Sequence, residues 1–417
     1  MTMNGRKRGF TSRHHGVRQG VATIWLTLAL IVSVVGGCGG QAGPPTPEPT
    51  PTTTDPPSRM TCAALIRGVE LEPTVAAPTA GVSEGRIDPS VAHDPTTGRV
   101  WMVYSGAEGG PFVGRPFRVS QRLAFSDDRG ASWCDHGEVV PVADLGDDCP
   151  PDSDGPCHFN QEVGTLVHMP GAPPARRWKL FYFTVAATPD NNYPFAQYLV
   201  REASQPEALA AATPRRLFAG GSFEFPPVAA WMDRHAAGLG PTEVRLDQLH
   251  PDLENCLQFS EMGTAADGDR LWASFLCADP GEHLTVLVST DDPELRAWRY
   301  HGVLVDGDDV RAIDASSPNY SASELFFGRD GQLRLSVSPV RAANNGSYHA
   351  CHIYRVTDPE TATVAPEPER VVTPNSETVH HGMCTYDPAL TETGLIAAQV
   401  FESRPFIRLI ATGETFP

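Results

Sequence analysis

A short pattern that recurs along the chain constrains its fold more than any other feature. Four segments start with a polar residue, continue with apolar residues, and reach an aspartate followed by Pro or Gly six positions later, before a second strand-like run. These segments start at Asp88, Glu261, Glu324 and His381, and a looser copy starts at Glu162. Five similar hairpins predict an all-β fold, a five-bladed β-propeller with one hairpin opening each blade. Chance similarity of turns within a β-sandwich is the alternative.

The first copy, RIDPSVAHDPTTGRVWMVYSG (86–106), places Asp88 at the start of a strand that otherwise looks buried. A carboxylate there is costly unless it has a partner or a function. In a propeller the first strand of every blade lines one central channel, so the five head residues are expected to converge there. Several carboxylates in one channel cannot all ionise freely, and their pKa values should spread apart as an acid/base pair requires. The alternative to an acid/base role is that the channel carboxylates bind a cation or cap strands.

The N-terminal segment predicts export. Basic residues precede the apolar stretch VATIWLTLALIVSVV (21–35), which is too short for a comfortable membrane span. The segment 1–38 ends in VGGC, which resembles a bacterial lipobox with Cys38 as the lipidated residue. The prediction is a lipoprotein held at the bacterial cell envelope by its acyl chains, including an amide-linked palmitate-type chain. An uncleaved anchor or a plain secretory signal is the alternative.

The sequence after the N-terminal segment predicts a linker followed by one domain. Residues 39–59 are rich in Pro and Thr and lack apolar periodicity, which predicts an extended linker. Residues 60–417 have many Pro and Gly and few helical patterns, as one large all-β domain would. The formal net charge of −18 argues against nucleic acid as a partner. We expect a monomer whose contact with the membrane is the lipid anchor.

The cysteines indicate disulfides. Of the 9 cysteines, an even number remains once Cys38 is set aside, which in an exported chain predicts up to four bridges. Zinc is the weaker interpretation, because no CxxC spacing occurs. The pairs that the spacing suggests are Cys149–Cys157, Cys256–Cys277 and Cys351–Cys384.

Several motifs resemble one family of carbohydrate-active enzymes. DPSV (88–91), followed by a turn and VWMVYS (100–105), resembles the first-blade signature of glycoside hydrolase family 43 and, more broadly, of the five-bladed propeller glycosidases. HHGMCTYDP (380–388) is similar to the fifth-blade turn of that family, and SDDRGASWCDHG (126–137) and VSTDDPELRAWRYHG (288–302) resemble its outer hairpins. A glutamate in the third blade and the sequence NQE (160–162) in the second depart from the family pattern.

The resemblance implies a role for each head residue. Asp88 would be the general base, Glu324 the general acid, and Glu261 the carboxylate that orients and tunes that acid. Glu162 would contact the sugar without taking part in the chemistry. His381 would be the channel histidine that helps to hold a cation, and a hard ion such as Ca²⁺ suits carboxylate and water oxygens.

A second resemblance concerns the sialidases. Ser126, Asp128, Gly130 and Trp133 fit the sialidase Asp-box pattern, whose role is to hold a hairpin turn. Arg86 begins a stretch similar to the first-blade start of sialidases and is a candidate substrate-binding residue. A six-bladed, sialidase-like propeller is therefore the alternative fold. Sialidases need three arginines to clamp the substrate carboxylate, whereas the head positions here are acidic or His, so exo-sialidase activity ranks below the others.

The sequence therefore favours a glycoside hydrolase that acts on a neutral glycan with inversion. The expected partner is carbohydrate. The alternative is a non-catalytic propeller that binds a glycan or a protein at the cell envelope. No G-x-S-x-G, P-loop or H-E-x-x-H motif points to another chemistry.

Overall fold

The computed structural model describes residues 84–417 except short stretches at 111–114, 147, 151–152, 154, 189–191, 221–230, 232–233, 236–237, 280–281, 341–347, 375–378 and 402–406. The predicted signal segment, the lipidation site Cys38 and the linker 39–59 lie outside these residues. Within the described part, no helix is long and apolar enough to cross a membrane.

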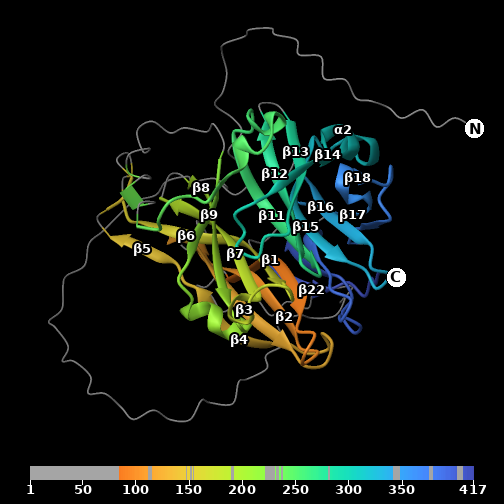
Figure 1. The fold of residues 1–417 in the computed structure, drawn as a ribbon, viewed down its shortest axis with the longest axis horizontal. Helices are drawn as coiled ribbons and strands as arrows, with labels where there is room; N and C mark the ends of the chain where they lie inside the picture. Colours follow the sequence, from red (N-terminus) through yellow and green to blue (C-terminus); the bar gives the residue numbers. More distant parts are fainter. Residues whose placement is uncertain are drawn as a thin grey trace, which may run out of the picture.

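Five sheets, almost entirely antiparallel, follow one another around a common centre (Figure 1). The first blade contains β1 (Glu84–His93), β2 (Val100–Gly110), β3 (Arg115–Ser126) and β4 (Cys134–Val140). The second contains β5 (Ala143–Gly146), β6 (Cys157–His168), β7 (Trp178–Ala187), β8 (Asn192–Ala203), β9 (Arg215–Ala219) and β10 (Val244–Arg245). The third contains β11 (Gln258–Asp267), β12 (Arg270–Asp279), β13 (Glu282–Thr290) and β14 (Arg299–Val305).

The fourth and fifth blades complete the ring. The fourth contains β15 (Asn319–Phe327), β16 (Leu333–Val340), β17 (Cys351–Asp358), β18 (Thr363–Val364) and β19 (Arg370–Val372). The fifth contains β20 (Val379–Thr385), β21 (Ile396–Phe401) and β22 (Ile407–Ala411). The α-helix α2 (Gly307–Ile313) and short 3₁₀ turns lie on the connections between strands.

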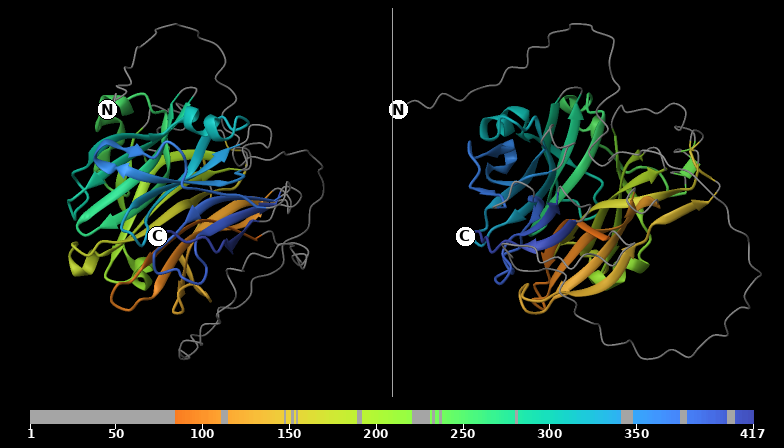
Figure 2. Two further views of the ribbon diagram at one scale, coloured as in Figure 1. Left: turned by 90° about the vertical axis from the view of Figure 1, so that its right-hand side faces the viewer. Right: turned by 180° about the vertical axis from the view of Figure 1, so that it is seen from behind.

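The innermost strands show that the ring is closed. The strands β1, β6, β11, β15 and β20 contact one another in that order, and β20 in turn contacts β1. The orange first blade and the dark blue last blade accordingly lie side by side in both views of Figure 2. The predicted five-bladed propeller is confirmed, and the six-bladed alternative is wrong. Among the described residues the blades carry from three to six strands, so the blade size is not uniform.

Each interface between neighbouring blades has its own apolar core. Alternating residues on the strands place Trp101 and Leu180 in the cluster between the first two blades, and Phe181 and Phe275 in the next. Similar clusters join the third blade to the fourth, the fourth to the fifth, and the fifth to the first. The sheets therefore bury both faces, which explains the nearly continuous apolar sequence of strands such as β7.

The aspartate that the repeat shares is a turn residue. The carboxylates of Asp94, Asp330 and Asp387 each accept a hydrogen bond from the backbone N–H two residues later, at 2.8–3.0 Å. Asp and Asn favour this turn because their short side chains can bond their own backbone. In the first hairpin Gly98 then adopts a φ of 73°, which only glycine does without strain.

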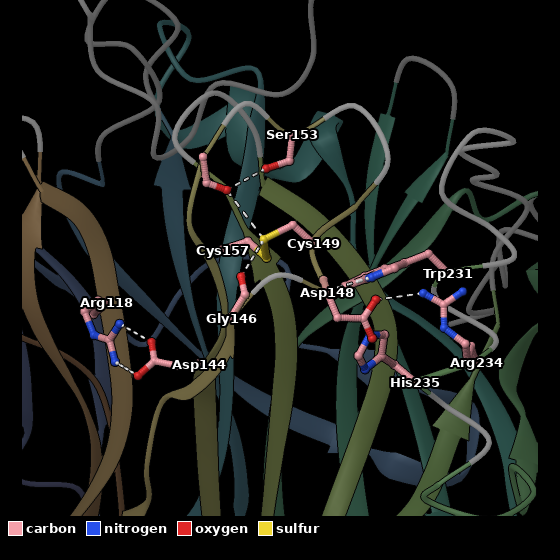
Figure 3. The surroundings of a disulfide bond; sticks show 11 residues. Arg118, Asp144, Gly146, Asp148, Cys149, Ser153, Cys157, Trp231, Arg234 and His235 are labelled. Carbon is pink, nitrogen blue, oxygen red and sulfur yellow. Dashed lines mark hydrogen bonds and ion pairs between the residues drawn. A yellow bond between two sulfur atoms is a disulfide. The ribbon is translucent and has the colours of Figure 1, made fainter.

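Three disulfides confirm the three predicted pairs. Cys149–Cys157 fastens the loop after β5 to the start of β6, beside Asp148 and its partners Arg234 and His235 (Figure 3). Cys256–Cys277 lies within the third blade, whereas Cys351–Cys384 joins β17 of the fourth blade to β20 of the fifth. The last bridge therefore ties two blades together close to the channel.

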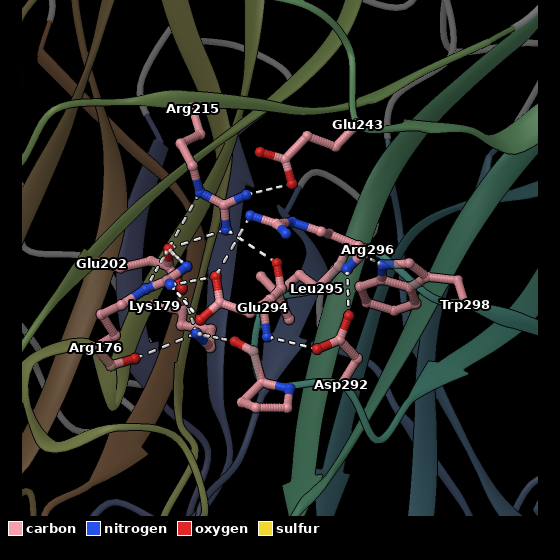
Figure 4. Close-up of polar contacts among 11 residues, drawn as sticks. Arg176, Lys179, Glu202, Arg215, Glu243, Asp292, Glu294, Leu295, Arg296 and Trp298 are labelled. Carbon is pink, nitrogen blue, oxygen red and sulfur yellow. Dashed lines mark hydrogen bonds and ion pairs between the residues drawn. The ribbon is translucent and has the colours of Figure 1, made fainter.

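A cluster of charges joins the second blade to the third (Figure 4). The carboxylate of Glu202 accepts hydrogen bonds from Lys179, from Arg176 at 2.5 Å and from Arg215 at 2.9 Å. Arg176 also binds Glu294, on the turn between β13 and β14, at 2.6 Å. Lys179 is completely buried, so Glu202 is the group that neutralises a charge inside the protein.

Candidate active site

The five innermost strands share one irregularity. Each contains a β-bulge, and the first residue of the bulge has a left-handed φ close to 50°. These residues are Asp88, Val163, Glu261, Ala322 and Met383. A residue other than glycine in this region stores roughly 1–3 kcal/mol of strain and persists where its surroundings impose it, commonly at functional sites. Bulges also change the direction of a side chain, and here all five do so at the channel.

The bulge gives the true alignment of the blades. Asp88 and Glu261 both occupy the first bulge position. Glu162 stands just before the bulge of its strand, His381 lies further before, and Glu324 lies beyond. The expectation that all five head residues occupy equivalent positions is therefore wrong for Glu162, Glu324 and His381. The repeat in the sequence is defined by the turn aspartate, but the number of residues between the bulge and that aspartate differs between blades.

The bulges surround one small pocket at the centre of the ring. Its lining combines bulge residues of all five blades with Glu324. Gly263 allows β11 to pack closely against β15, because a Cβ at this position would lie 2.4 Å from the Cα of Glu324. Asp88, Glu261 and Glu324 thus meet in the pocket, as the sequence predicted, whereas Glu162 and His381 are not among its lining residues.

Asp88 is held by two neighbouring strands. Its Oδ2 accepts a hydrogen bond from the hydroxyl of Ser105 at 2.8 Å and from the backbone N–H of Val163 at 3.4 Å. Burial nevertheless raises the pKa of Asp88 to about 6, because these two bonds only partly offset the loss of solvation. Gln121 in turn donates to Ser105 at 2.8 Å and fixes its orientation.

Glu261 and Glu162 complete a coupled group of carboxylates. Burial, with smaller contributions from the charges of Asp88 and Glu162, raises the pKa of Glu261 to about 8. Burial raises the pKa of Glu162 to about 7, again with a contribution from Asp88. The backbone beside Glu261 is supported by Tyr198, whose hydroxyl accepts the N–H of Met262 at 3.0 Å. The three carboxyl groups therefore titrate at different pH values.

Glu324 lines the same pocket, but the charges of the other carboxyl groups do not contribute to its pKa. Burial raises its pKa well above the usual range, opposed by the hydrogen bond from Ser90. The hydroxyl of Ser90 lies 2.9 Å from Oε1 of Glu324. Sequence reasoning missed Ser90, Ser105 and Tyr198, because a serine or tyrosine within a strand carries no signal of what it will contact.

The remaining predicted site residues lie away from the pocket. His381 is buried, and its Nε2 is 3.3 Å from the side-chain nitrogen of Gln399. Burial, with a smaller contribution from the charge of His380, lowers the pKa of His381 to about 4. The described residues contain no group of three or more His, Cys, Asp or Glu side chains placed to hold a metal ion. A Ca²⁺ ion near His381 stays a prediction. Arg86 is partly buried and does not line the pocket.

The Asp-box residues lie in the turn between β3 and β4. The hydroxyl of Ser126 accepts the N–H of Gly130 at 2.7 Å, Asp128 accepts the N–H of Ser132, and the indole of Trp133 donates to the carbonyl of Gly130. The turn between β13 and β14 repeats the arrangement, with Asp292 accepting from Arg296 and Trp298 donating to Leu295. These contacts are local to each turn and carry no information about substrate.

The raised pKa values predict a protein that loses stability as the pH rises. A carboxyl group whose folded pKa exceeds its unfolded pKa keeps its proton longer in the folded state, so its stabilising effect disappears between the two values. Glu261→Gln should therefore increase the free energy of unfolding at about pH 8 by at least ~1 kcal/mol and change little at about pH 4. Urea denaturation at both pH values measures this. The exposed Glu254→Gln is the matched control, and equal effects of the two variants would contradict the prediction.

Comparison with known proteins gives a distant result. Neither a family model nor a curated protein sequence matches this chain. Among solved structures, a glycosyl hydrolase from Bacteroides ovatus is 10% identical with a TM-score of 0.44, over 84% of this chain and 93% of the other. The α-L-arabinofuranosidase of Podospora anserina, in complex with cellotriose, is 11% identical with a TM-score of 0.41, over 83% and 93%. Likenesses this distant leave the activity to be judged from the site itself.

The fold and the pocket together define a class of protein. The chain is a five-bladed β-propeller whose central pocket is lined by carboxyl groups from the first, third and fourth blades.

Proposed function

We propose that this protein is a glycoside hydrolase that acts on a neutral glycan with inversion. The observation that carries the proposal is the pair Asp88 and Glu261, which occupy equivalent bulge positions in one pocket but have pKa values of about 6 and about 8. Because the charge of Asp88 raises the pKa of Glu261, Asp88 ionises first and Glu261 keeps its proton to a higher pH. Two carboxyl groups with separated pKa values are what acid/base cleavage of a glycosidic bond requires.

The reaction follows from these protonation states. Asp88 removes a proton from a water molecule while the water oxygen attacks the anomeric carbon. Glu261 gives its proton to the glycosidic oxygen, whose bond to that carbon breaks, and an alcohol leaves. Each turnover consumes one water and leaves Asp88 protonated and Glu261 ionised, until a proton returns through solvent. Inversion requires the two carboxyl groups to stand roughly 6.5–9.5 Å apart, so that the water fits between Asp88 and the sugar.

This assignment changes three of the roles that the family resemblance implies. Glu261 takes the role of general acid because it shares the bulge position of Asp88 and is coupled to it. Glu162 takes the tuning role, because its charge raises the pKa of Glu261. Glu324 is left for another function, since the charges of the other carboxyl groups do not contribute to its pKa.

The chemistry of the lining favours a neutral sugar. None of the residues that line the pocket is an arginine or a lysine, so an anionic sugar would meet carboxyl groups without a clamp. This argues against the sialidase alternative. A non-catalytic propeller that binds glycan or protein remains the rival, and a lipid anchor at Cys38 would hold either protein at the cell envelope.

A panel of substrates tests the proposal. Aryl arabinosides, xylosides, fructosides, galactosides and sialosides are incubated with the purified protein, and the first anomer released is identified by NMR. We expect turnover of at least one neutral glycoside with inverted configuration. Turnover of the sialoside alone would indicate that the protein is a sialidase. Absence of turnover throughout, with binding of an oligosaccharide by calorimetry, would favour the rival.

A further inference from the structure

Beneath the pocket, a chain of hydrogen bonds connects four of the five blades. It starts at Oε1 of Glu324 on β15, continues 2.9 Å to the hydroxyl of Ser90 on β1 and 3.2 Å to that of Thr165 on β6, and ends 2.7 Å further at the hydroxyl of Thr264 on β11. Glu324 and the three hydroxyl residues are all less than one tenth exposed. The reaction proposed above uses none of them.

The protonation state of Glu324 controls the direction of this chain. The hydroxyl of Ser90 already accepts the backbone N–H of Leu166 at 3.1 Å. If Glu324 is ionised, Ser90 must give its hydrogen to Glu324, and Thr165 and Thr264 must both point their hydrogens the same way. If Glu324 is protonated, it can instead donate to Ser90, and the chain can run in either direction. Each hydroxyl group has one hydrogen to donate, so one end fixes the others.

The surroundings favour the protonated form. Glu324 has no cation beside it, and its one hydrogen-bond donor among the described residues is Ser90. An ionised carboxylate buried with a single neutral donor is far more costly than a neutral acid with the same bond. Glu324 also lines the pocket, while Oε1 is occupied by Ser90. Its other oxygen is the group left to meet a ligand.

We propose that Glu324 is a neutral carboxylic acid that binds a non-reacting hydroxyl group of the sugar at the floor of the pocket, and that Ser90, Thr165 and Thr264 hold it in place. A neutral carboxyl group both donates and accepts a hydrogen bond, as a sugar hydroxyl does. Glu324 then determines which sugar fits, whereas Asp88 and Glu261 perform the reaction. The substrate class is a neutral sugar whose innermost hydroxyl reaches the floor. This role rests on the proposed function, but the protonation state of Glu324 does not.

Substitution by glutamine tests the role in binding. Gln has the shape of a neutral carboxylic acid and its capacity to donate and accept, so Glu324→Gln should change kcat/KM of the best substrate by less than about 3-fold. Glu324→Ala should raise KM about 10-fold with a smaller change in kcat, because one hydrogen bond to the sugar is lost. A fall of kcat in Glu324→Gln as large as in Glu261→Gln would overturn the proposal, since it would make Glu324 the acid.

Infrared spectroscopy tests the protonation state whether or not the protein is a hydrolase. At about pH 7 the carbonyl band of a protonated carboxylic acid should be lost in Glu324→Gln and kept in Glu254→Gln, the exposed control. Thr165→Val removes a hydroxyl with little change in volume and should shift this band, because it breaks the chain two residues from Glu324. A carboxylate band lost in place of the acid band would overturn the proposal. If the acid band is present but no glycoside is turned over, the proposed function fails and the neutral Glu324 stands.

Discussion

Glu261→Gln is expected to lower turnover of glycosides that have poor leaving groups by at least ~100-fold, which is typical of the loss of a general acid. Asp88→Asn should cause a loss of similar size with every leaving group, because activation of the attacking water by Asp88 is needed whichever group leaves. Initial rates with phenyl and dinitrophenyl glycosides separate the two cases. The dinitrophenyl leaving group needs little protonation, so it should largely restore the activity of Glu261→Gln and not that of Asp88→Asn.

The pH profile provides the control. Wild-type kcat/KM should rise as Asp88 ionises near pH 6 and fall as Glu261 ionises near pH 8. Glu261→Gln should abolish the fall, and Asp88→Asn should abolish the rise. Glu162→Gln should move the basic limb to lower pH, because the charge of Glu162 raises the pKa of Glu261. A basic limb that survives in Glu261→Gln and disappears in Glu324→Gln would return the acid role to Glu324.

Glu202→Ala is expected to lower the free energy of unfolding by roughly 3–5 kcal/mol, the usual cost of breaking a buried ion pair by removing one partner. The variant leaves Lys179 completely buried without its counter-charge, and it releases Arg176 and Arg215. Although burial raises the pKa of Glu202, the neighbouring Lys179 and Arg176 lower it overall, so the carboxylate is the charged partner at neutral pH. Thermal and urea unfolding at about pH 7 measure the effect, since Glu ordinarily ionises near pH 4.

Glu294→Ala is the matched control for this cluster. Glu294 also binds Arg176, but its side chain is 38% exposed and Lys179 keeps Glu202. Exposed ion pairs contribute about 0–1 kcal/mol, so Glu294→Ala should have a much smaller effect. Equal losses in the two variants would show that the cluster acts through its contacts with the third blade rather than by neutralising Lys179.

The sequence was informative where the structure depends on local pattern. Hairpin heads followed by a turn aspartate predicted the number of blades, because Asp94 and its counterparts close the turns with their own backbone. The cysteine spacing predicted three disulfides, since paired cysteines on neighbouring strands are close in sequence as well as in space. Asp88 and Glu261 were identified correctly as residues of one channel.

The tertiary structure decided the register of the channel and therefore the chemistry of each carboxyl group. The bulges arise where five strands crowd around one centre, and nothing in the sequence of a single strand marks Val163 or Ala322 as equivalent to Asp88. Counting from the turns placed all five head residues at equivalent positions, whereas the bulges leave only Asp88 and Glu261 equivalent. The pKa of a carboxyl group depends on its solvation and on neighbouring charges, both of which come from other blades. The sequence alone identified Asp88, Glu261 and Glu324 as channel residues, whereas only the packing of the blades excluded Glu162 and His381 from the pocket lining and set the pKa of each carboxyl group.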